Sequence, residues 1–126
     1  MAGDDRIVVV GSGPAGSRAA ETLYRGGCRN LTVISEAPAS GGQIYRRQPD
    51  GFKRPPASLY GDDAPKAVRL HDRFDAIAGE IDYRPGTLVW NIFDGAVHTS
   101  DASGTERLEF DRLILSTGAM DRNIPI

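Results

Sequence analysis

Short apolar runs alternate with helical patterns in the first part of the chain and return at its end. The runs at residues 7–10, 31–35 and 112–118 are rich in Val, Ile and Leu. Short runs that are apolar on both faces are typical of strands buried in a parallel sheet. Residues 14–24, between the first two runs, are expected to form a helix that the Gly26-Gly27 pair would end. The pattern therefore predicts an α/β chain built on a parallel sheet.

A second helical pattern occupies the middle of the chain. Apolar residues recur at helical spacing from Ala67 to Ile77, after a polar start at residues 62–65 and before Gly79, where the helix would end. His71 falls off this apolar stripe, so we expect its side chain to face solvent. A lone histidine in that position is a poor candidate for a catalyst.

From residue 81 onward the pattern changes to alternation with a period of two, which is typical of strands. Strands are expected at residues 88–93, 96–100 and 107–110, joined by turns that each contain a glycine. Trp90, in the first of these strands, is expected to be a packing residue. The alternation therefore predicts a three-stranded antiparallel β-meander inserted into the parallel sheet.

The turn between the first strand and the first helix carries the pattern Gly11-x-Gly13-x-x-Gly16. In dinucleotide-binding folds the first glycine allows the tight turn, the second lets a pyrophosphate approach the backbone, and the third lets helix and strand pack closely. The helix start directs unsatisfied N–H groups and a positive dipole at an anion, and Pro14 suits such a start. Glu36 ends the second strand at about the distance from the glycines where a ribose-binding acid is expected. The sequence therefore predicts a dinucleotide site.

A loop rich in glycine and then in basic residues follows Glu36. Its glycines deny it regular structure and expose backbone N–H groups at the sheet edge where open α/β folds hold ligands. We expect either a plain surface loop or a second ligand-contacting loop, in which Gln43 offers both a donor and an acceptor. The basic cluster is open to two interpretations as well, because its charges either are solvated or face phosphates, an anionic substrate or a partner. It consists of Arg46, Arg47, Lys53 and Arg54.

Length and composition limit the class of protein. The 126 residues, 40% of them hydrophobic, suffice for a single domain, residues 1–126, with a core of its own. A net charge of −2 gives no case for nucleic acid or an acidic membrane surface as a partner. The sequence has neither a long apolar segment nor a secretion leader, and its single cysteine, Cys28, is expected to be a buried structural thiol. We therefore expect a cytoplasmic protein.

Taken together, these motifs resemble the flavoproteins with two dinucleotide-binding domains, the superfamily of glutathione reductase and thioredoxin reductase. The resemblance lies in the glycine turn, Glu36, the Gly-Gly-Gln loop, the meander and the closing Leu-Ile-Leu-Ser-Thr-Gly strand. Residues 41–46 and 116–126 are most similar to the branch that oxidises amines and amino acids. That branch includes opine oxidase, cyanide synthase and multi-subunit proline dehydrogenase components and the alpha subunit of sarcosine oxidase. The implied fold is a Rossmann-like FAD-binding domain.

The resemblance implies FAD as the cofactor and a set of residues that bind it. The glycine turn would hold the pyrophosphate, Glu36 would bind the adenosine ribose, and the backbone near Leu88 or Val89 would meet the adenine edge. The Gly-Gly-Gln loop would line the passage to the flavin, and the end of the last strand would close over the pyrophosphate. The family pattern has an alanine where Ser116 stands here. The complete set is Gly11, Ser12, Gly13, Pro14, Ala15, Gly16, Glu36, Ala37, Gly42, Gln43, Leu88, Val89, Thr117 and Gly118.

The resemblance implies the FAD-binding portion of a flavin-dependent oxidoreductase that oxidises an amino acid or a secondary amine. Two alternatives are part of an NAD(P)H-dependent flavoprotein reductase and a non-catalytic dinucleotide-binding module. The second nucleotide domain, which would hold NAD(P), and the return of the chain to the FAD domain are missing from these 126 residues. We therefore expect an incomplete domain that binds FAD weakly and is inactive alone. No catalytic or metal-binding residue is predicted, whereas partner subunits and self-association through an open sheet edge are expected.

Overall fold

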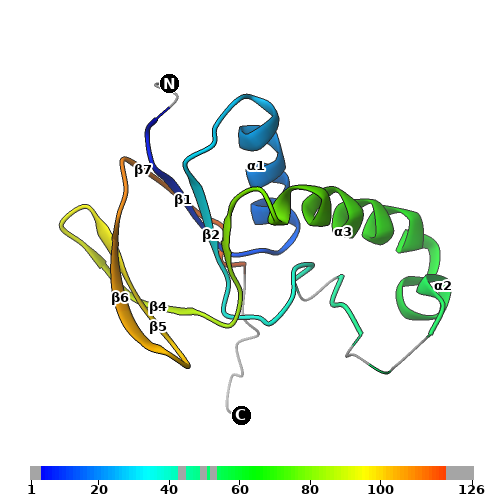
Figure 1. Cartoon of the computed structure of the whole chain (residues 1–126). Coiled ribbons are helices and arrows are strands. Elements are labelled where there is room, and N and C mark those ends of the chain that lie inside the picture. Colours follow the sequence, from blue (N-terminus) through cyan, green and yellow to red (C-terminus); the bar gives the residue numbers. More distant parts are fainter. Residues whose placement is uncertain (1–3, 43–44, 49–50, 52–53, 119–126) are drawn as a thin grey trace, which may run out of the picture.

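The computed structural model describes residues 4–42, 45–48, 51 and 54–118, which form three layers (Figure 1). The middle layer is a parallel sheet of order β3-β2-β1-β7, which confirms the predicted sheet. Its strands are β1 (Ile7–Val10), β2 (Leu31–Ile34), β3 (Asp82–Arg84) and β7 (Arg112–Leu115). β3 was not predicted, because it is only three residues long and has a charged residue at each end.

Helices cover one face of this sheet. The long helices are α1 (Pro14–Arg25) and α3 (Ala64–Ala78), and both confirm helices predicted from the sequence. A short helix α2 (Pro56–Tyr60) and a 3-10 turn (Gly61–Asp63) lead into α3. α1 ends where the Gly26 N–H donates to the Thr22 carbonyl, at 3.0 Å.

The core beneath the helices joins side chains from the strands and from both long helices. Alternate residues of a strand point to opposite faces of a sheet, so Ile7 and Val9 face the helices while Val8 and Val10 face away. Phe74 of α3 is the largest fully buried side chain in the described part of the chain. The buried members of this helix-side cluster are Ile7, Val9, Ala20, Cys28, Leu31, Val33, Phe74 and Ile77.

The predicted meander covers the other face. It comprises β4 (Leu88–Phe93), β5 (Ala96–Asp101) and β6 (Gly104–Glu109), paired antiparallel in that order. Its third strand begins earlier than predicted. The buried members of the meander-side cluster are Val8, Val10, Ile34, Val97 and Leu108.

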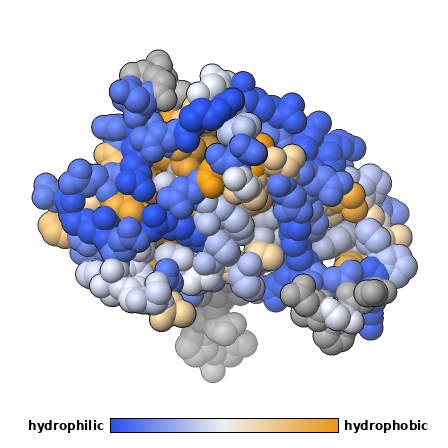
Figure 2. All heavy atoms as spheres, viewed as in Figure 1, coloured by the Kyte–Doolittle hydropathy of each residue, from blue (hydrophilic) through white to orange (hydrophobic). Residues whose placement is uncertain are grey.

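The outer face of the meander carries exposed aromatic side chains. Trp90 is 56% exposed, so the prediction that it is a packing residue is wrong. A β-bulge between Val89 and Asn91 shifts the register of β4, and Trp90 lies on the outside beside the His98 ring, with 5.4 Å between ring centroids. Phe93 stacks on the same histidine. Elsewhere, on the side of the molecule seen in Figure 2, most residues are hydrophilic.

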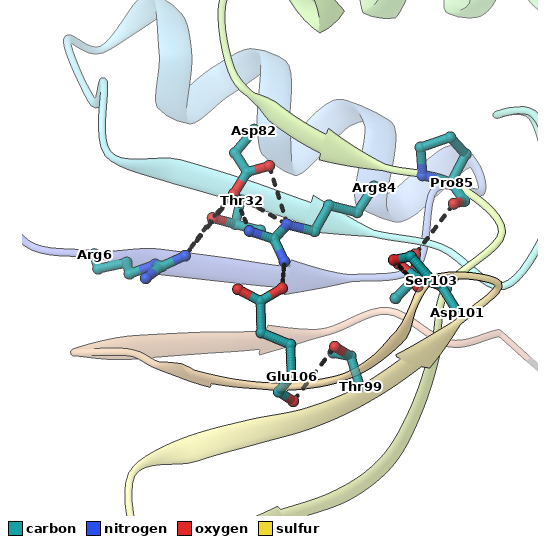
Figure 3. Close-up of polar contacts among 10 residues, drawn as sticks. Arg6, Thr32, Asp82, Arg84, Pro85, Thr99, Asp101, Ser103 and Glu106 are labelled. Carbon is teal, nitrogen blue, oxygen red and sulfur yellow. Dashed lines mark hydrogen bonds and ion pairs between the residues drawn. The ribbon is translucent and has the colours of Figure 1, made fainter.

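An ion-pair network joins the two sheets at their margin (Figure 3). Arg84 of β3 reaches Glu106 of β6, with 2.6 Å between Nη1 and Oε2, and also pairs with Asp82 at 3.0 Å. Asp82 accepts a hydrogen bond from Thr32 of β2 at 3.3 Å and lies 3.8 Å from the Arg6 guanidinium. The hydrogen bond to Asp82 is the largest of the contacts that raise the pKa of Arg84. The network therefore fixes the end of β3 relative to the meander.

Candidate functional site

The glycine turn between β1 and α1 is packed as tightly as its sequence predicts. Gly11 has a φ of 110°, and a Cβ atom there would lie 2.1 Å from the Ser116 carbonyl oxygen at the end of β7. A Cβ atom on Gly16 would lie 2.0 Å from the Gly11 carbonyl oxygen. Real Cβ atoms do not approach oxygen this closely, so the turn, the helix and the end of β7 come together only because both residues are glycine.

The first turn of α1 offers N–H groups that no side chain caps. Gly13 is the N-cap, Pro14 occupies the first helical position, and the first turn contains no acidic residue. The earliest backbone bond of the helix runs from the Ser17 N–H to the Gly13 carbonyl at 2.9 Å, which leaves the N–H groups of Ala15 and Gly16 without an intrahelical acceptor. Such an end attracts an anion through its N–H groups and the helix dipole.

Ser12 connects this turn to two neighbouring segments. Its side chain is only 3% exposed and donates to the Ser35 hydroxyl at 2.8 Å, so only its backbone can face a ligand. Its carbonyl oxygen accepts hydrogen bonds from the Ser17 hydroxyl and from the Gly41 N–H, both at 2.9 Å. The glycine turn and the loop after β2 are therefore joined directly.

The second glycine-containing loop lies against the first. A Cβ atom on Gly42 would approach the Gly13 Cα atom to 2.9 Å, and the φ of Gly42 is 67°. A Cβ atom on Gly13 would meet only Gly42, at 3.5 Å, so the backbone of Gly13 is otherwise open to a ligand within the described part of the chain. Gln43, the other predicted binding residue of this loop, lies outside the described residues.

The segments predicted to hold the adenosine end also come together. Glu36 is exposed immediately after Ser35, whose carbonyl accepts the Thr87 N–H at 2.8 Å. The Ala37 carbonyl accepts the Gly86 N–H at 3.1 Å. These two bonds place the connection between β3 and β4 beside Glu36.

The two meander residues predicted for the adenine edge differ in their surroundings. Leu88 is 45% exposed and follows the segment that lies beside Glu36. Val89 packs against the meander-side cluster, so its side chain already belongs to the core. Of the two, only Leu88 presents a side chain that a ligand can reach.

The end of β7 is bound to the end of β1. The Ser116 N–H and hydroxyl both donate to the Val10 carbonyl, at 2.8 and 3.0 Å. Thr117 and Gly118 follow as exposed residues. The strand order and the Gly11–Ser116 contact bring them to the same edge of the sheet as the glycine turn.

The structure corrects one expectation about a polar side chain and describes another that the sequence left open. His71 does not face solvent, because its Nε2 lies 2.8 Å from the Tyr45 carbonyl oxygen in the loop. Arg47, a member of the basic cluster whose role the sequence left open, pairs through its guanidinium with Asp75 of α3 at 2.8 Å. Arg46 and Arg54 are exposed, and Lys53 lies outside the described residues.

Tyr83 of β3 has a buried hydroxyl group. Burial raises the pKa of Tyr83, and the nearby Ser12 hydroxyl opposes that shift to a lesser extent. Ser12 does not reach the geometry of a hydrogen bond, so the Tyr83 hydroxyl has no partner among the described residues. The ring packs edge-on against Phe74, with 5.0 Å between centroids, which indicates that Tyr83 belongs to the core.

Two further features concern the described residues alone, namely groups of metal ligands and helices that could span a membrane. No group of three His, Cys, Asp or Glu side chains in the described residues could hold a metal ion, and Cys28 is a buried free thiol. None of the helices described there is long and apolar enough to cross a membrane.

Comparisons with known proteins agree with this arrangement. The model of the pyridine nucleotide-disulphide oxidoreductase family matches residues 5–126. An opine oxidase subunit from Rhizobium meliloti (strain 1021) is 35% identical over 120 residues, which are 94% of this chain and 25% of that protein. At this coverage the chain spans about a quarter of the length of that relative.

Solved structures share the fold at low sequence identity. L-proline dehydrogenase from P. horikoshii superposes with a TM-score of 0.65 at 21% identity, over 95% of this chain and 24% of that one. Bacillithiol disulfide reductase from Bacillus cereus superposes with a TM-score of 0.59 at 20% identity, over 91% of this chain and 29% of that one. These likenesses concern the fold alone.

Proposed function

Because this chain belongs to the pyridine nucleotide-disulphide oxidoreductase family, we propose that it binds FAD and forms the adenosine diphosphate end of the cofactor site in a flavin-dependent oxidoreductase. The observation that carries this proposal is the convergence of three segments at the uncapped start of α1. These segments are the glycine turn, the Gly42 backbone and the end of β7.

The residues at this edge fit such a cofactor. The N–H groups of Ala15 and Gly16 have no intrahelical acceptor and no side-chain cap, and Gly13 has no side chain to keep a pyrophosphate away from the backbone. Glu36 is exposed beside the β3–β4 connection, where its carboxylate can accept hydrogen bonds from ribose hydroxyls. FAD, when bound, supplies the hydride-accepting chemistry, and this chain holds and orients its adenosine end.

The binding set proposed for this role is the one expected from the sequence, with two refinements. Ser12 would act through its backbone, and the backbone near Leu88 or Val89 would meet the adenine edge, where Leu88 also offers an exposed side chain. Gln43 and its neighbours stay in the proposal as expectations. NAD(P) would bind only through a second domain outside these residues.

For the complete enzyme we propose oxidation of an amino acid or a secondary amine. The support is the 35% identity to the opine oxidase component, which is named as one subunit and so indicates assembly with others. The groups that contact the amine, the flavin end of the cofactor site and the partner subunits would come from outside these 126 residues. The chain alone is then expected to be inactive and to bind FAD weakly.

The experiment that tests the cofactor proposal is a nuclear magnetic resonance titration of the isotope-labelled chain with FAD, ADP, NAD⁺ and FMN. FAD and ADP are expected to shift the amide signals of Ala15 and Gly16 with similar Kd values, because the chain provides contacts for their shared end. FMN, which lacks that end, is expected to cause no shift. The proposal fails if saturating FAD leaves these signals unchanged.

Two further outcomes separate the alternatives. NAD⁺ binding much tighter than ADP would favour a non-catalytic NAD-binding module, since the nicotinamide end would then find contacts within this chain. Tight one-to-one FAD binding by the monomer would contradict the expected weak affinity. Glu36→Gln should weaken ADP binding about tenfold through loss of a charged acceptor, whereas Glu80→Gln, at another exposed glutamate, should leave it unchanged.

A further inference from the structure

The described residues of the loop that carries Gly41 and Gly42, 36–42 and 45–48, form no helix or strand, yet several contacts define their position. The Gly41 N–H donates to the Ser12 carbonyl at 2.9 Å, and Gly42 packs on Gly13. The loop leaves β2, passes the start of α1 and then runs alongside α3 (Figure 1). Its two glycines have φ values of 122° and 67°, and glycine adopts positive φ about as readily as negative φ, so local preferences alone do not fix the conformation of the chain there. Contacts elsewhere must therefore hold it in place.

Arg47, which follows the glycine pair, provides these contacts by binding both Ser40, just before the pair, and Asp75 of α3. Its Nη1 and Nη2 donate to the two carboxylate oxygens of Asp75 at 2.9 and 2.8 Å, a bidentate pair. Its Nη2 also donates to the Ser40 hydroxyl at 2.8 Å, and its Nε donates to the Ser40 carbonyl at 3.1 Å. Ser40 is 4% exposed and immediately precedes Gly41, so the guanidinium acts on the residue next to the glycine pair.

Other contacts close the same loop. The Tyr45 N–H donates to the Gly41 carbonyl at 3.2 Å, while the Tyr45 carbonyl lies 2.8 Å from His71 Nε2. A Cβ atom on Gly41 would come within 2.1 Å of that same carbonyl, so the loop is folded tightly against α3. The Tyr60 hydroxyl donates to the Arg46 carbonyl at 2.7 Å on the outer side.

We propose that Arg47, held by Asp75, is a positioning residue for the dinucleotide, which fixes the Gly41-Gly42 backbone at the start of α1 without itself contacting the ligand. This inference rests on the proposed function. The positive charge of Arg47 is paired with Asp75, and its other hydrogen bonds are made to Ser40 and to the His71 carbonyl. The binding of FAD therefore depends on a pair whose members are 28 residues apart in the sequence and both lie outside the expected binding set.

Two substitutions with opposite effects on charge test this proposal. Arg47→Met removes a positive charge near the anionic ligand, and Asp75→Asn removes a negative one. If the pair acted only through its electrostatic field, Asp75→Asn would strengthen FAD binding. If the pair positions the loop, both variants should bind FAD about five- to tenfold more weakly. The reason is that the released Gly41-Gly42 backbone would have to become ordered when FAD binds. Arg69→Met, at an exposed arginine of the same helix, is the matched control and should bind FAD like the parent chain.

The second measurement is amide hydrogen exchange without ligand. Exchange at Gly41 should accelerate in both Arg47→Met and Asp75→Asn, while exchange at Val9 in the sheet stays as in the parent chain. Failure of the parent chain to bind FAD would overturn the proposed function and this inference with it. FAD binding by the parent chain combined with unchanged FAD affinity in both variants, or unchanged Gly41 exchange, would overturn this inference alone.

Discussion

The two faces of the parallel sheet are covered in different ways. Among the described residues, the helix-side cluster has eight buried members and includes Phe74, whereas the meander-side cluster has five and no aromatic residue. The helices hold the glycine turn and the Arg47 loop. The meander carries Leu88 and is joined to the sheet by the smaller of the two buried clusters and by the ion pair of Arg84 with Glu106.

This difference teaches that the two ends of the proposed cofactor site depend on different forces. The pyrophosphate end rests on buried side chains and close backbone contacts, and disrupting these lowers the free energy of unfolding strongly. The adenine end rests partly on charged pairs that solvent reaches, which contribute little to stability. Substitutions on the two faces should therefore change the free energy of unfolding by different amounts.

The largest effect is expected from Phe74→Ala on the helix side. Removing this fully buried ring leaves a cavity between α3 and the sheet, and the loss in the free energy of unfolding should be about 3–5 kcal/mol. Denaturant unfolding measures it. Val68→Ala, at a residue of the same helix that is 37% exposed, serves as the control. A loss for Phe74→Ala as small as that for Val68→Ala would show that α3 contributes little to the core.

A smaller loss is expected from Leu108→Ala on the meander side, about 2–4 kcal/mol, because this residue is 4% exposed but has fewer buried neighbours. Hydrogen exchange should accelerate more in β5 than in β1. Leu59→Ala, at a residue of α2 that is 37% exposed, is the matched control. A uniform rise in exchange across both sheets would contradict the separate roles of the two faces.

The smallest effect is expected from Arg84→Met, less than about 1 kcal/mol, because the Arg84 and Glu106 side chains are 25% and 56% exposed. Arg107→Met is the control, since Arg107 pairs with Glu109 of its own strand and does not join the sheets. A double-mutant cycle of Arg84→Met with Glu106→Gln measures the coupling. A coupling energy of zero would show that this pair does not hold the meander in place.

The sequence predicted much of this fold because the strands at the centre of the sheet carry an unbroken apolar signal. β1, β2, β7 and the two long helices follow from periodicity and glycine stops. β3 escaped prediction because Asp82 and Arg84 interrupt any apolar run, and its identity as a strand comes from pairing with β2. Trp90 was misjudged because a bulge changes which face a residue occupies, and alternation alone does not reveal a bulge.

The glycine positions of the candidate site were visible in the sequence because the chemistry of a tight turn demands glycine. Arg47 and Asp75 were not, since a pair separated by 28 residues leaves no local pattern. His71 was placed in solvent because helical spacing puts it off the apolar stripe. Its actual partner, a backbone carbonyl of the loop, could not be read from residue types.

The Ser12 carbonyl, which accepts hydrogen bonds from both Ser17 and Gly41, has a consequence for exchanging parts between related proteins. In a chimera that receives only residues 11–16 from a relative, the Ser12 carbonyl would come from the relative, whereas the loop that donates to it would come from the recipient. The glycine turn, residues 40–48 and the stretch of α3 from 71 to 75 therefore make up one unit of exchange. An engineer who moves this nucleotide turn into another protein must transplant all three segments together.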